Sequence, residues 1–165
     1  MMFNFEFDFA GRLQCIPMVV RFNLDRCGIK LSLKQWNRFT HRERVRLIEQ
    51  LCGAADDVRE YRNLLIELIR DHTGERAEEI AVEERPAWDD VTQVPPRLEA
   101  YARDLGMAPP RLPVWRELSP LQRFALFKLT RPGHRNENFG PAMEEFGLAA
   151  HQMRLASGRQ DTKVT

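Results

Sequence analysis

The sequence predicts a mainly α-helical fold, a compact bundle of six to seven helices with a short Phe-rich strand at the N-terminus. Three observations lead to this prediction. Two tryptophans precede the same helix-start motif, and residues 55–72 carry apolar side chains spaced three and four apart. Single glycines and prolines separate the periodic segments, as is usual at helix ends.

A Trp-x-x-apolar-Ser/Thr spacing occurs at Trp36, Trp88 and Trp115. The first and third copies continue with Glu or Gln three residues after the hydroxyl residue, which is the capping-box pattern. We therefore expect helices to begin after Thr40 and Ser119, each with a tryptophan on its approach. A ring in this position usually fills the core, and this interpretation is favoured over an exposed interface anchor.

The first third of the chain predicts a strand and then three helices. Phenylalanines alternate with polar residues from Phe3 to Phe9, the period of a strand with one apolar face. Such a strand must lie on the helical core, a second strand or a partner. Pro17 suits the first turn of a helix that Gly28 ends in a left-handed conformation. Further helices are expected over residues 32–36, opened by a Ser-x-x-Gln capping box, and 40–52.

The longest helix is expected over residues 55–72, with a long acidic connection after it and shorter helices beyond. The connection, residues 75–94, is weakly patterned and predicts one helical turn at most. Consecutive prolines predict a stiff extended link over residues 108–113, because proline fixes φ and disfavours helix before it. The remaining helices are expected over residues 95–105, 119–130 and 141–147.

Length and charge favour one domain over residues 1–150, with a polar C-terminal tail over residues 151–165. The net charge of +1 argues against a protein that coats nucleic acid. No apolar run approaches the roughly 20 residues that span a bilayer, and acids interrupt the N-terminal apolar residues where a signal peptide has none. A cytoplasmic protein, with neither nucleic acid nor membrane as partner, is expected.

The residue types used for catalysis and metal binding do not converge. Cys15, Cys27 and Cys52 are widely spaced, so buried, inert thiols are favoured over a metal site or a redox role. His41 and His134 each lie beside a predicted helix end, where solvated or capping roles are favoured over acid–base work. The acidic clusters lack the order of a calcium loop. We therefore expect no enzyme activity, no metal and no cofactor.

Charge is arranged in blocks along the chain. Residues 21–46 hold eight Lys or Arg against two acids, residues 53–104 hold fourteen acids against seven Arg, and residues 111–135 hold six basic groups against one acid. The two basic blocks could form one surface that steers a partner, or the blocks could pair with each other inside the fold. The candidate partner contacts are Arg21, Lys30, Lys34, Arg38 and Arg123, with His134 and Asn138 on a connection that could be a binding loop.

Two long strings resemble a known family. Residues 16–36, IPMVVRFNLDRCGIKLSLKQW, are similar to the opening of the nitrate reductase-associated protein family, whose members are also called nitrate reductase maturation proteins. Residues 121–129, LQRFALFKL, then His134, Asn138 and residues 141–148, PAMEEFGL, are similar to its closing part. The alternating phenylalanines also fit, so the resemblance extends over residues 3–148.

The resemblance implies a cytoplasmic accessory protein, a maturation factor or chaperone for an assimilatory nitrate reductase. Its expected partners are the reductase catalytic subunit and molybdenum-cofactor biosynthesis proteins. The implied role is to hold the enzyme receptive for molybdenum cofactor or an iron–sulfur cluster. A molybdopterin carrier, with basic groups and the residue 134–138 loop holding the phosphate, is the alternative. A third class, an enzyme that uses Cys27 or Cys52, would require an unusually acidic thiol.

Overall fold

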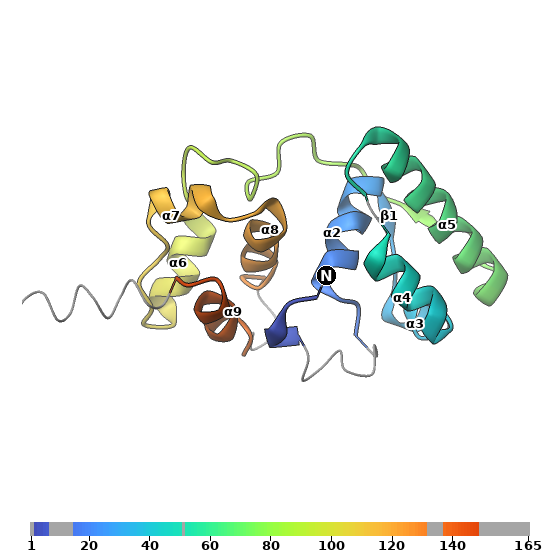
Figure 1. The fold of residues 1–165 in the computed structure, drawn as a ribbon, viewed down its shortest axis with the longest axis horizontal. Coiled ribbons are helices and arrows are strands. Elements are labelled where there is room, and N and C mark those ends of the chain that lie inside the picture. Colours follow the sequence, from blue (N-terminus) through green and yellow to red (C-terminus); the bar gives the residue numbers. More distant parts are fainter. Residues whose placement is uncertain (1, 7–14, 51, 132–136, 149–165) are drawn as a thin grey trace, which may run out of the picture. The chain divides into compact units, whose positions relative to one another are not determined.

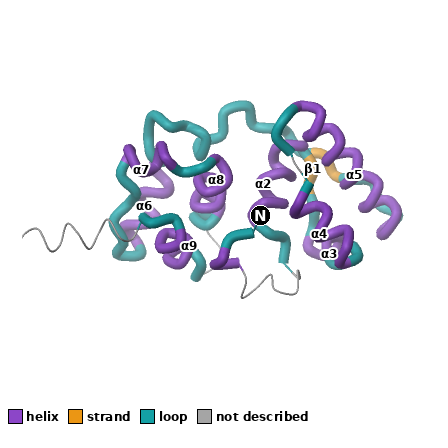
Figure 2. The backbone as a smooth tube through the Cα atoms, in the orientation of Figure 1, coloured by secondary structure: helices purple, strands orange, loops and turns teal. Residues whose placement is uncertain are grey.

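The computed structural model describes residues 2–6, 15–50, 52–131 and 137–148, which contain eight α-helices, one 3₁₀ turn and two short strands (Figures 1 and 2). The mainly helical fold class is therefore confirmed. The chain divides into two compact units, Met1–Glu84 (unit 1) and Arg85–Thr165 (unit 2). The single domain expected over residues 1–150 stays a prediction, and residues 151–165 lie outside the described part.

Unit 1 is a helical layer with a small antiparallel ladder. Its long helix packs against α2 and α3, and its core includes the fully buried Trp36, Tyr61 and Leu65. Ile29 pairs with Glu79 and Lys30 with Glu78 across the ladder, which sequence reasoning missed. The elements are α2 (Met18–Cys27), β1 (Ile29–Lys30), α3 (Leu33–Trp36), α4 (His41–Glu49), α5 (Ala55–Thr73) and β2 (Glu78–Glu79).

The N-terminal strand prediction is wrong for the residues that the structure describes. Asn4–Glu6 form a 3₁₀ turn, η1, and the rings of Phe3 and Phe5 stack with centroids 5.3 Å apart. The reason is Glu6, whose buried carboxylate accepts hydrogen bonds from the Phe3 N–H and, at 2.7 Å, from the Met18 N–H. The segment is thus folded back to cap the start of α2. Phe7 and Phe9 lie outside the described residues.

Gly28 ends α2 as predicted, with φ of 67°, and it also lies against the segment after β2. A Cβ atom on Gly28 would be 2.9 Å from the Ile80 carbonyl oxygen and 3.0 Å from Val82 Cγ2. Gly74 ends α5 with nearly the same φ, 69°, but a Cβ there would meet nothing within 4 Å. A side chain at position 28 is therefore disfavoured both by the positive φ and by the close contact, whereas at position 74 only the positive φ disfavours it.

Substituting Gly28→Ala is expected to lower the free energy of unfolding by about 2 to 3 kcal/mol, with about 1 kcal/mol from the left-handed backbone and the rest from the close contact. Urea denaturation monitored by circular dichroism measures the loss. Gly74→Ala is the matched control and is expected to cost about 1 kcal/mol, since only the backbone contribution applies. Equal losses in the two variants would contradict the proposed contact at position 28.

The described residues of unit 2 form four helices, in which α8 packs against both α6 and α9. The extended link expected over residues 108–113 is wrong at its end, because Leu112 and Pro113 already belong to α7. Proline is tolerated in the first turn of a helix, where the missing N–H would have no partner. The elements are α6 (Pro96–Asp104), α7 (Leu112–Glu117), α8 (Pro120–Lys128) and α9 (Phe139–Glu145).

The two units repeat one local structure. In each, a helix and a positive-φ glycine (Gly28 or Gly106) come before a short helix that carries a buried tryptophan. That helix is followed by a turn and a helix with a complete capping box, formed by Thr40 with Glu43 in α4 and by Ser119 with Gln122 in α8. The turn hydrogen bond also repeats, from Phe39 N–H to the Trp36 carbonyl and from Leu118 N–H to the Trp115 carbonyl. The predicted helix starts are therefore confirmed.

All three tryptophans belong to the core, as predicted, but the middle copy of the spacing opens no helix. Trp88 is buried in a turn and meets the Phe124 ring edge-on at 5.6 Å between centroids. Two carbonyls shortly after Trp88 accept hydrogen bonds from α7. The Asp90 carbonyl accepts from Trp115 Nε1 and the Val91 carbonyl from Arg116 Nε, each at 2.9 Å. This segment thus closes over α7 and α8.

Candidate functional site

Two of the predicted partner contacts are held by their own chain. The Lys30 ammonium forms an ion pair with Glu78 at 2.9 Å across the β1–β2 ladder. Arg21 Nε donates to the Ile16 carbonyl at 2.9 Å, although the residue is exposed. Here the acidic and basic blocks pair with each other, and a surface ion pair of this kind contributes little to stability.

Lys34 and Arg38 are placed together by the fold. Lys34 lies in α3, and the Arg38 N–H donates to the Gln35 carbonyl, so the helical turn extends past Trp36 to Arg38. Residues four apart on a helical turn share one side of it. Both side chains are exposed, and the structure gives neither a side-chain hydrogen bond nor an ion pair within the described part of the chain.

Two residues that sequence reasoning missed extend this pattern. Arg42 and Arg46 are exposed on α4, four residues apart, and the described residues likewise offer them no side-chain partner. We call Lys34, Arg38, Arg42 and Arg46 the basic strip. The available signal was the spacing of four within each helical segment, from Lys34 to Arg38 and from Arg42 to Arg46.

Arg123 was expected to contact a partner at the surface, and this prediction is wrong because the side chain is buried. Its guanidinium donates to the Leu118 and Trp88 carbonyls and reaches the Asp89 carboxylate at 3.3 Å. This bonding holds the Trp88 segment on α8, so little of the group is left for a partner. Asn138 is half-buried directly before α9 and caps it with no side-chain hydrogen bond, whereas His134 lies outside the described residues.

A Glu–His pair between α4 and α5 also escaped sequence reasoning. Glu43 Oε2 lies 2.9 Å from His72 Nε2, and the same carboxylate accepts from the Thr40 N–H at 2.7 Å. Partial burial acts to raise the pKa of Glu43, but the hydrogen bonds from Thr40 and His72 outweigh it and the pKa lies below its ordinary value. Because the carboxylate completes a capping box, a structural role explains the pair.

The cysteines divide into one exposed and two buried thiols. Cys27 and Cys52 are buried, as expected, whereas Cys15 is exposed, so the expectation of burial is wrong there. Burial raises the pKa of Cys27 to about 11 and raises that of Cys52 as well. A thiolate nucleophile needs the opposite shift, which argues against both as nucleophiles. The described residues contain no group of three or more metal-ligating side chains.

The Cys27 shift predicts alkaline destabilisation. The pKa of this thiol is about 8.5 in the unfolded chain and about 11 in the folded protein. Its contribution to stability is therefore complete below about pH 8.5 and is lost as the pH rises through about 11. We expect a loss of about 2 to 3 kcal/mol by pH 11. Urea titrations at a series of pH values measure it. Cys27→Ala should reduce the slope between about pH 8.5 and about 10, and the remaining slope belongs to Cys52, whose pKa burial also raises. This range lies below that in which Tyr61, whose pKa is raised by burial as well, adds its own effect. An unchanged slope would contradict the assignment.

Residues 2–146 match the family described as conserved nitrate reductase-associated protein. The chain belongs to that family. No curated protein and no solved structure shows significant similarity to the chain. The family resemblance noted in the sequence is therefore confirmed, and the family's description associates its members with nitrate reductase.

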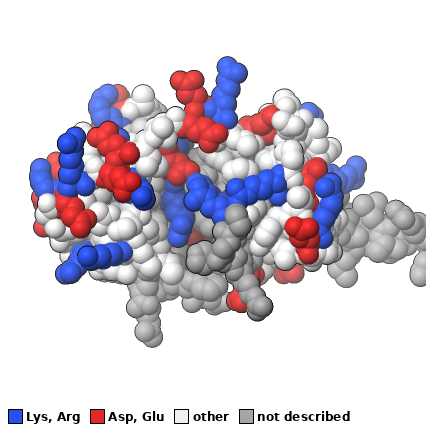
Figure 3. Space-filling model, turned by 180° about the vertical axis from the view of Figure 1, so that it is seen from behind, with Lys and Arg blue, Asp and Glu red and all other residues white. Residues whose placement is uncertain are grey.

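The surface of the family member is mixed in charge. Basic and acidic side chains stand next to each other on the face seen in Figure 3. Of the two alternatives for the basic blocks, pairing with acidic residues is seen at Lys30 and Glu78, and one shared basic surface stays a hypothesis. Among the described residues, no helix combines the length and the apolar character that a membrane span requires.

Proposed function

We propose that this protein is a non-catalytic accessory factor that binds an assimilatory nitrate reductase in the cytoplasm and assists its maturation. The family match over residues 2–146 is the observation that carries this proposal. Binding the unloaded enzyme more tightly than the loaded one would keep it receptive for molybdenum cofactor or an iron–sulfur cluster. It would also make release follow from loading, because a ligand shifts an equilibrium only by its differential affinity for the two states.

The surface chemistry supports a protein partner. The basic strip leaves four cationic side chains exposed and unpaired within the described part of the chain. Such groups speed association with a complementary surface and contribute to partner choice. Trp36 of α3 and Leu47 of α4 are fully buried in the core of unit 1, so the strip is presented on an ordered scaffold.

The test is a direct comparison of two forms of the reductase. Purified full-length protein is immobilised, and reductase from cells of the same source is applied either depleted of molybdenum cofactor or fully loaded. We expect the depleted form to bind about tenfold more tightly or better, which corresponds to about 1.4 kcal/mol of differential affinity. A strain that lacks this protein should accumulate reductase with reduced molybdenum content. Failure of both forms to bind, together with normal loading in that strain, would refute the proposal.

The same preparation distinguishes the carrier alternative. A molybdopterin carrier should retain or take up a fluorescent pterin when purified without the reductase. A pterin that co-purifies in stoichiometric amount, with no affinity for either form of the enzyme, would favour carriage over partner binding. Candidate secondary partners are proteins of molybdenum-cofactor biosynthesis, and the depleted reductase complex is the form in which we expect to find them.

A further inference from the structure

We propose that the basic strip is the docking surface of this protein and that its occupant is an acidic segment of the protein partner. The inference rests on the proposed function and adds to it the contact surface and the chemistry of the partner. The strip consists of two pairs, Lys34 with Arg38 and Arg42 with Arg46, on consecutive helical segments joined by a short turn. Each pair is spaced by four residues and shares one side of its segment.

The first observation is that the four strip side chains have no hydrogen-bond or ion-pair partner among the described residues, whereas most other basic side chains of unit 1 have one. Elsewhere in unit 1, Arg59, Arg62 and Arg70 form ion pairs with carboxylates. Arg26 and Arg44 donate to backbone carbonyls at 2.7 and 3.0 Å. Among the described residues of unit 1, the basic side chains with no such partner are the four of the strip and Arg76.

The second observation comes from the repeated structure in unit 2. The α7–α8 pair has the same turn and capping box as α3–α4, so the positions of the two pairs correspond one to one. Folding this structure does not require cations at the strip positions, since the counterparts in unit 2 are Pro113, Glu117, Leu121 and Ala125.

Burial differs between the copies as well. Ala125, the counterpart of Arg46, is fully buried, and α8 packs against both α6 and α9. The contrast lies in the second pair: the positions of Arg42 and Arg46 are exposed in unit 1 but half-buried (Leu121) and buried (Ala125) in unit 2, whereas Pro113 and Glu117 are exposed like Lys34 and Arg38. Arg44 and Arg123 also correspond to each other, but here both units have a basic residue. Both donate to the carbonyl that precedes the cap, so a basic residue with a structural role is kept in both copies.

The strip's chemistry indicates the kind of occupant. Three guanidinium groups and one ammonium group favour carboxylates, to which arginine donates through paired N–H groups. Leu33, next to Lys34, is an exposed large apolar residue with 49% of its surface accessible. An acidic segment that also carries an apolar side chain complements both features. A net charge of only +1 for the whole chain argues against a nucleic acid as the occupant.

The test removes the four charges without disturbing the core. The strip variant is K34Q/R38Q/R42Q/R46Q, and the matched control is R59Q/R70Q/R76Q/R103Q, which removes the same charge from other exposed positions. Affinity for purified cofactor-depleted nitrate reductase is measured for both at low and moderate salt. We expect the strip variant to bind at least about tenfold more weakly and to lose most of its salt dependence, and the control to bind within about twofold of the unmodified chain. Circular dichroism and thermal unfolding confirm that both variants fold.

A zero-length carbodiimide cross-link identifies the occupant. Lys34 is the one amine in the strip, so it is expected to join to an Asp or Glu of the reductase, and R42K should add a second cross-link to the same acidic segment. Two comparison probes, a short DNA duplex and phosphatidylserine vesicles, test other anionic occupants. Tighter binding of either probe than of the reductase, lost in the strip variant, would overturn the assignment.

The outcomes separate the two proposals. If the unmodified chain binds neither form of the reductase and loading is normal in the strain that lacks it, the proposed function fails. If it binds and the strip and control variants bind equally well, the proposed function stands and the docking surface is refuted. Cross-links confined to residues outside the strip would refute it in the same way.

Discussion

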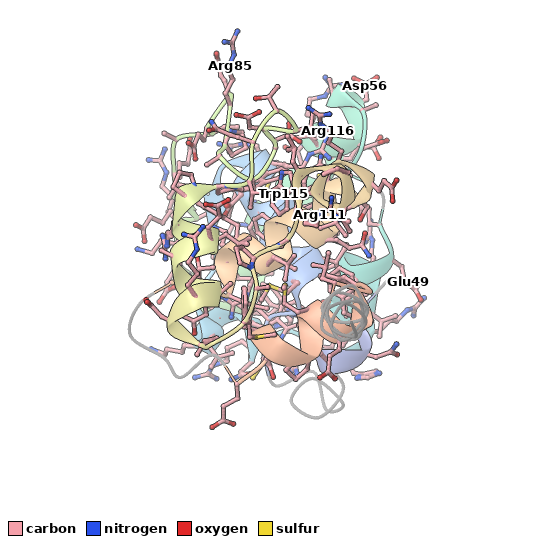
Figure 4. All side chains as sticks on the ribbon, turned by 90° about the vertical axis from the view of Figure 1, so that its left-hand side faces the viewer. Glu49, Asp56, Arg85, Arg111, Trp115 and Arg116 are labelled. Atoms are coloured by element: carbon pink, nitrogen blue, oxygen red, sulfur yellow. The ribbon has the colours of Figure 1, made fainter. Side chains whose placement is uncertain are left out.

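Replacing Trp115 by alanine is expected to lower the free energy of unfolding of unit 2 by about 3 to 5 kcal/mol. The ring is fully buried, whereas Arg111, directly before α7, and Arg116, on α7, are exposed (Figure 4). The substitution removes the packing of the ring and leaves a cavity, and it also removes the indole N–H that donates to the Asp90 carbonyl at 2.9 Å. The latter leaves a carbonyl acceptor without its donor, which adds to the cost.

The corresponding substitution Trp36→Ala provides the matched comparison, because Trp36 is also fully buried and has the same place in unit 1. Amide hydrogen exchange by mass spectrometry reports each unit separately. If the units unfold independently, W115A should accelerate exchange in α8 and leave α5 protected, with the reverse pattern for W36A. Acceleration of both helices in both variants would instead support the single domain expected over residues 1–150. A loss below about 1 kcal/mol in either variant would contradict the core role of that tryptophan.

Replacing Arg123 by methionine is expected to cost about 3 to 5 kcal/mol, although methionine fills much of the same space. The guanidinium donates to the Trp88 and Leu118 carbonyls, so its removal leaves two acceptors without a partner in a buried environment. Each orphaned group costs about 1 to 3 kcal/mol. The Asp89 carboxylate, which is 53% exposed, can be hydrated and adds little. Equilibrium urea denaturation measures the loss.

Two further variants define what Arg123 contributes. Arg123→Lys keeps the charge but not the planar set of N–H groups, so most of the loss should remain. Arg44→Met removes the corresponding residue of unit 1. It is expected to cost less, because Arg44 is only half-buried and one of its acceptors is the carbonyl of Asn37, an exposed residue that water can reach. Full recovery of stability in R123K would show that charge, and not the pattern of hydrogen bonds, is what matters at this position.

The parts of the fold that sequence predicted are those fixed within a few residues. The capping boxes at Ser32, Thr40 and Ser119 form as expected because donor and acceptor are three residues apart. The left-handed end at Gly28 is equally local. The spacing of apolar residues over 55–72 predicted α5 for the same reason. In each case, the chemistry that decides the structure is visible in one short segment.

The errors have non-local causes. Alternating phenylalanines predicted a strand, but the Glu6 carboxylate binds the Met18 N–H twelve residues away, and a 3₁₀ turn results. The Arg123 side chain was expected at the surface, yet the Trp88 carbonyl that it binds lies 35 residues earlier. The β1–β2 pairing joins Lys30 to Glu78 across 48 residues. No short window of sequence carries these partners.

Two of the four residues of the basic strip were predicted from the sequence. Lys34 and Arg38 were selected from charge alone, and Arg42 and Arg46 form a second pair with the same spacing of four, which the sequence also contains. Charge could not show which of the basic residues had partners inside the chain. Lys30 and Arg123 were removed from the candidate contacts by interactions with Glu78 and with the Trp88 segment, which only the structure reveals.

The hydrogen bonds that set the shape of the first eighty-four residues have a consequence for biosynthesis. The caps of α3 and α4, the Glu6 clamp on α2 and the β1–β2 ladder all join groups that precede Arg85. If unit 1 folds by itself, a nascent chain can complete this portion on the ribosome while the remaining residues are still being translated, as domains generally do. The charged side chains of α3 and α4 would then stand on an ordered scaffold before the polypeptide is finished.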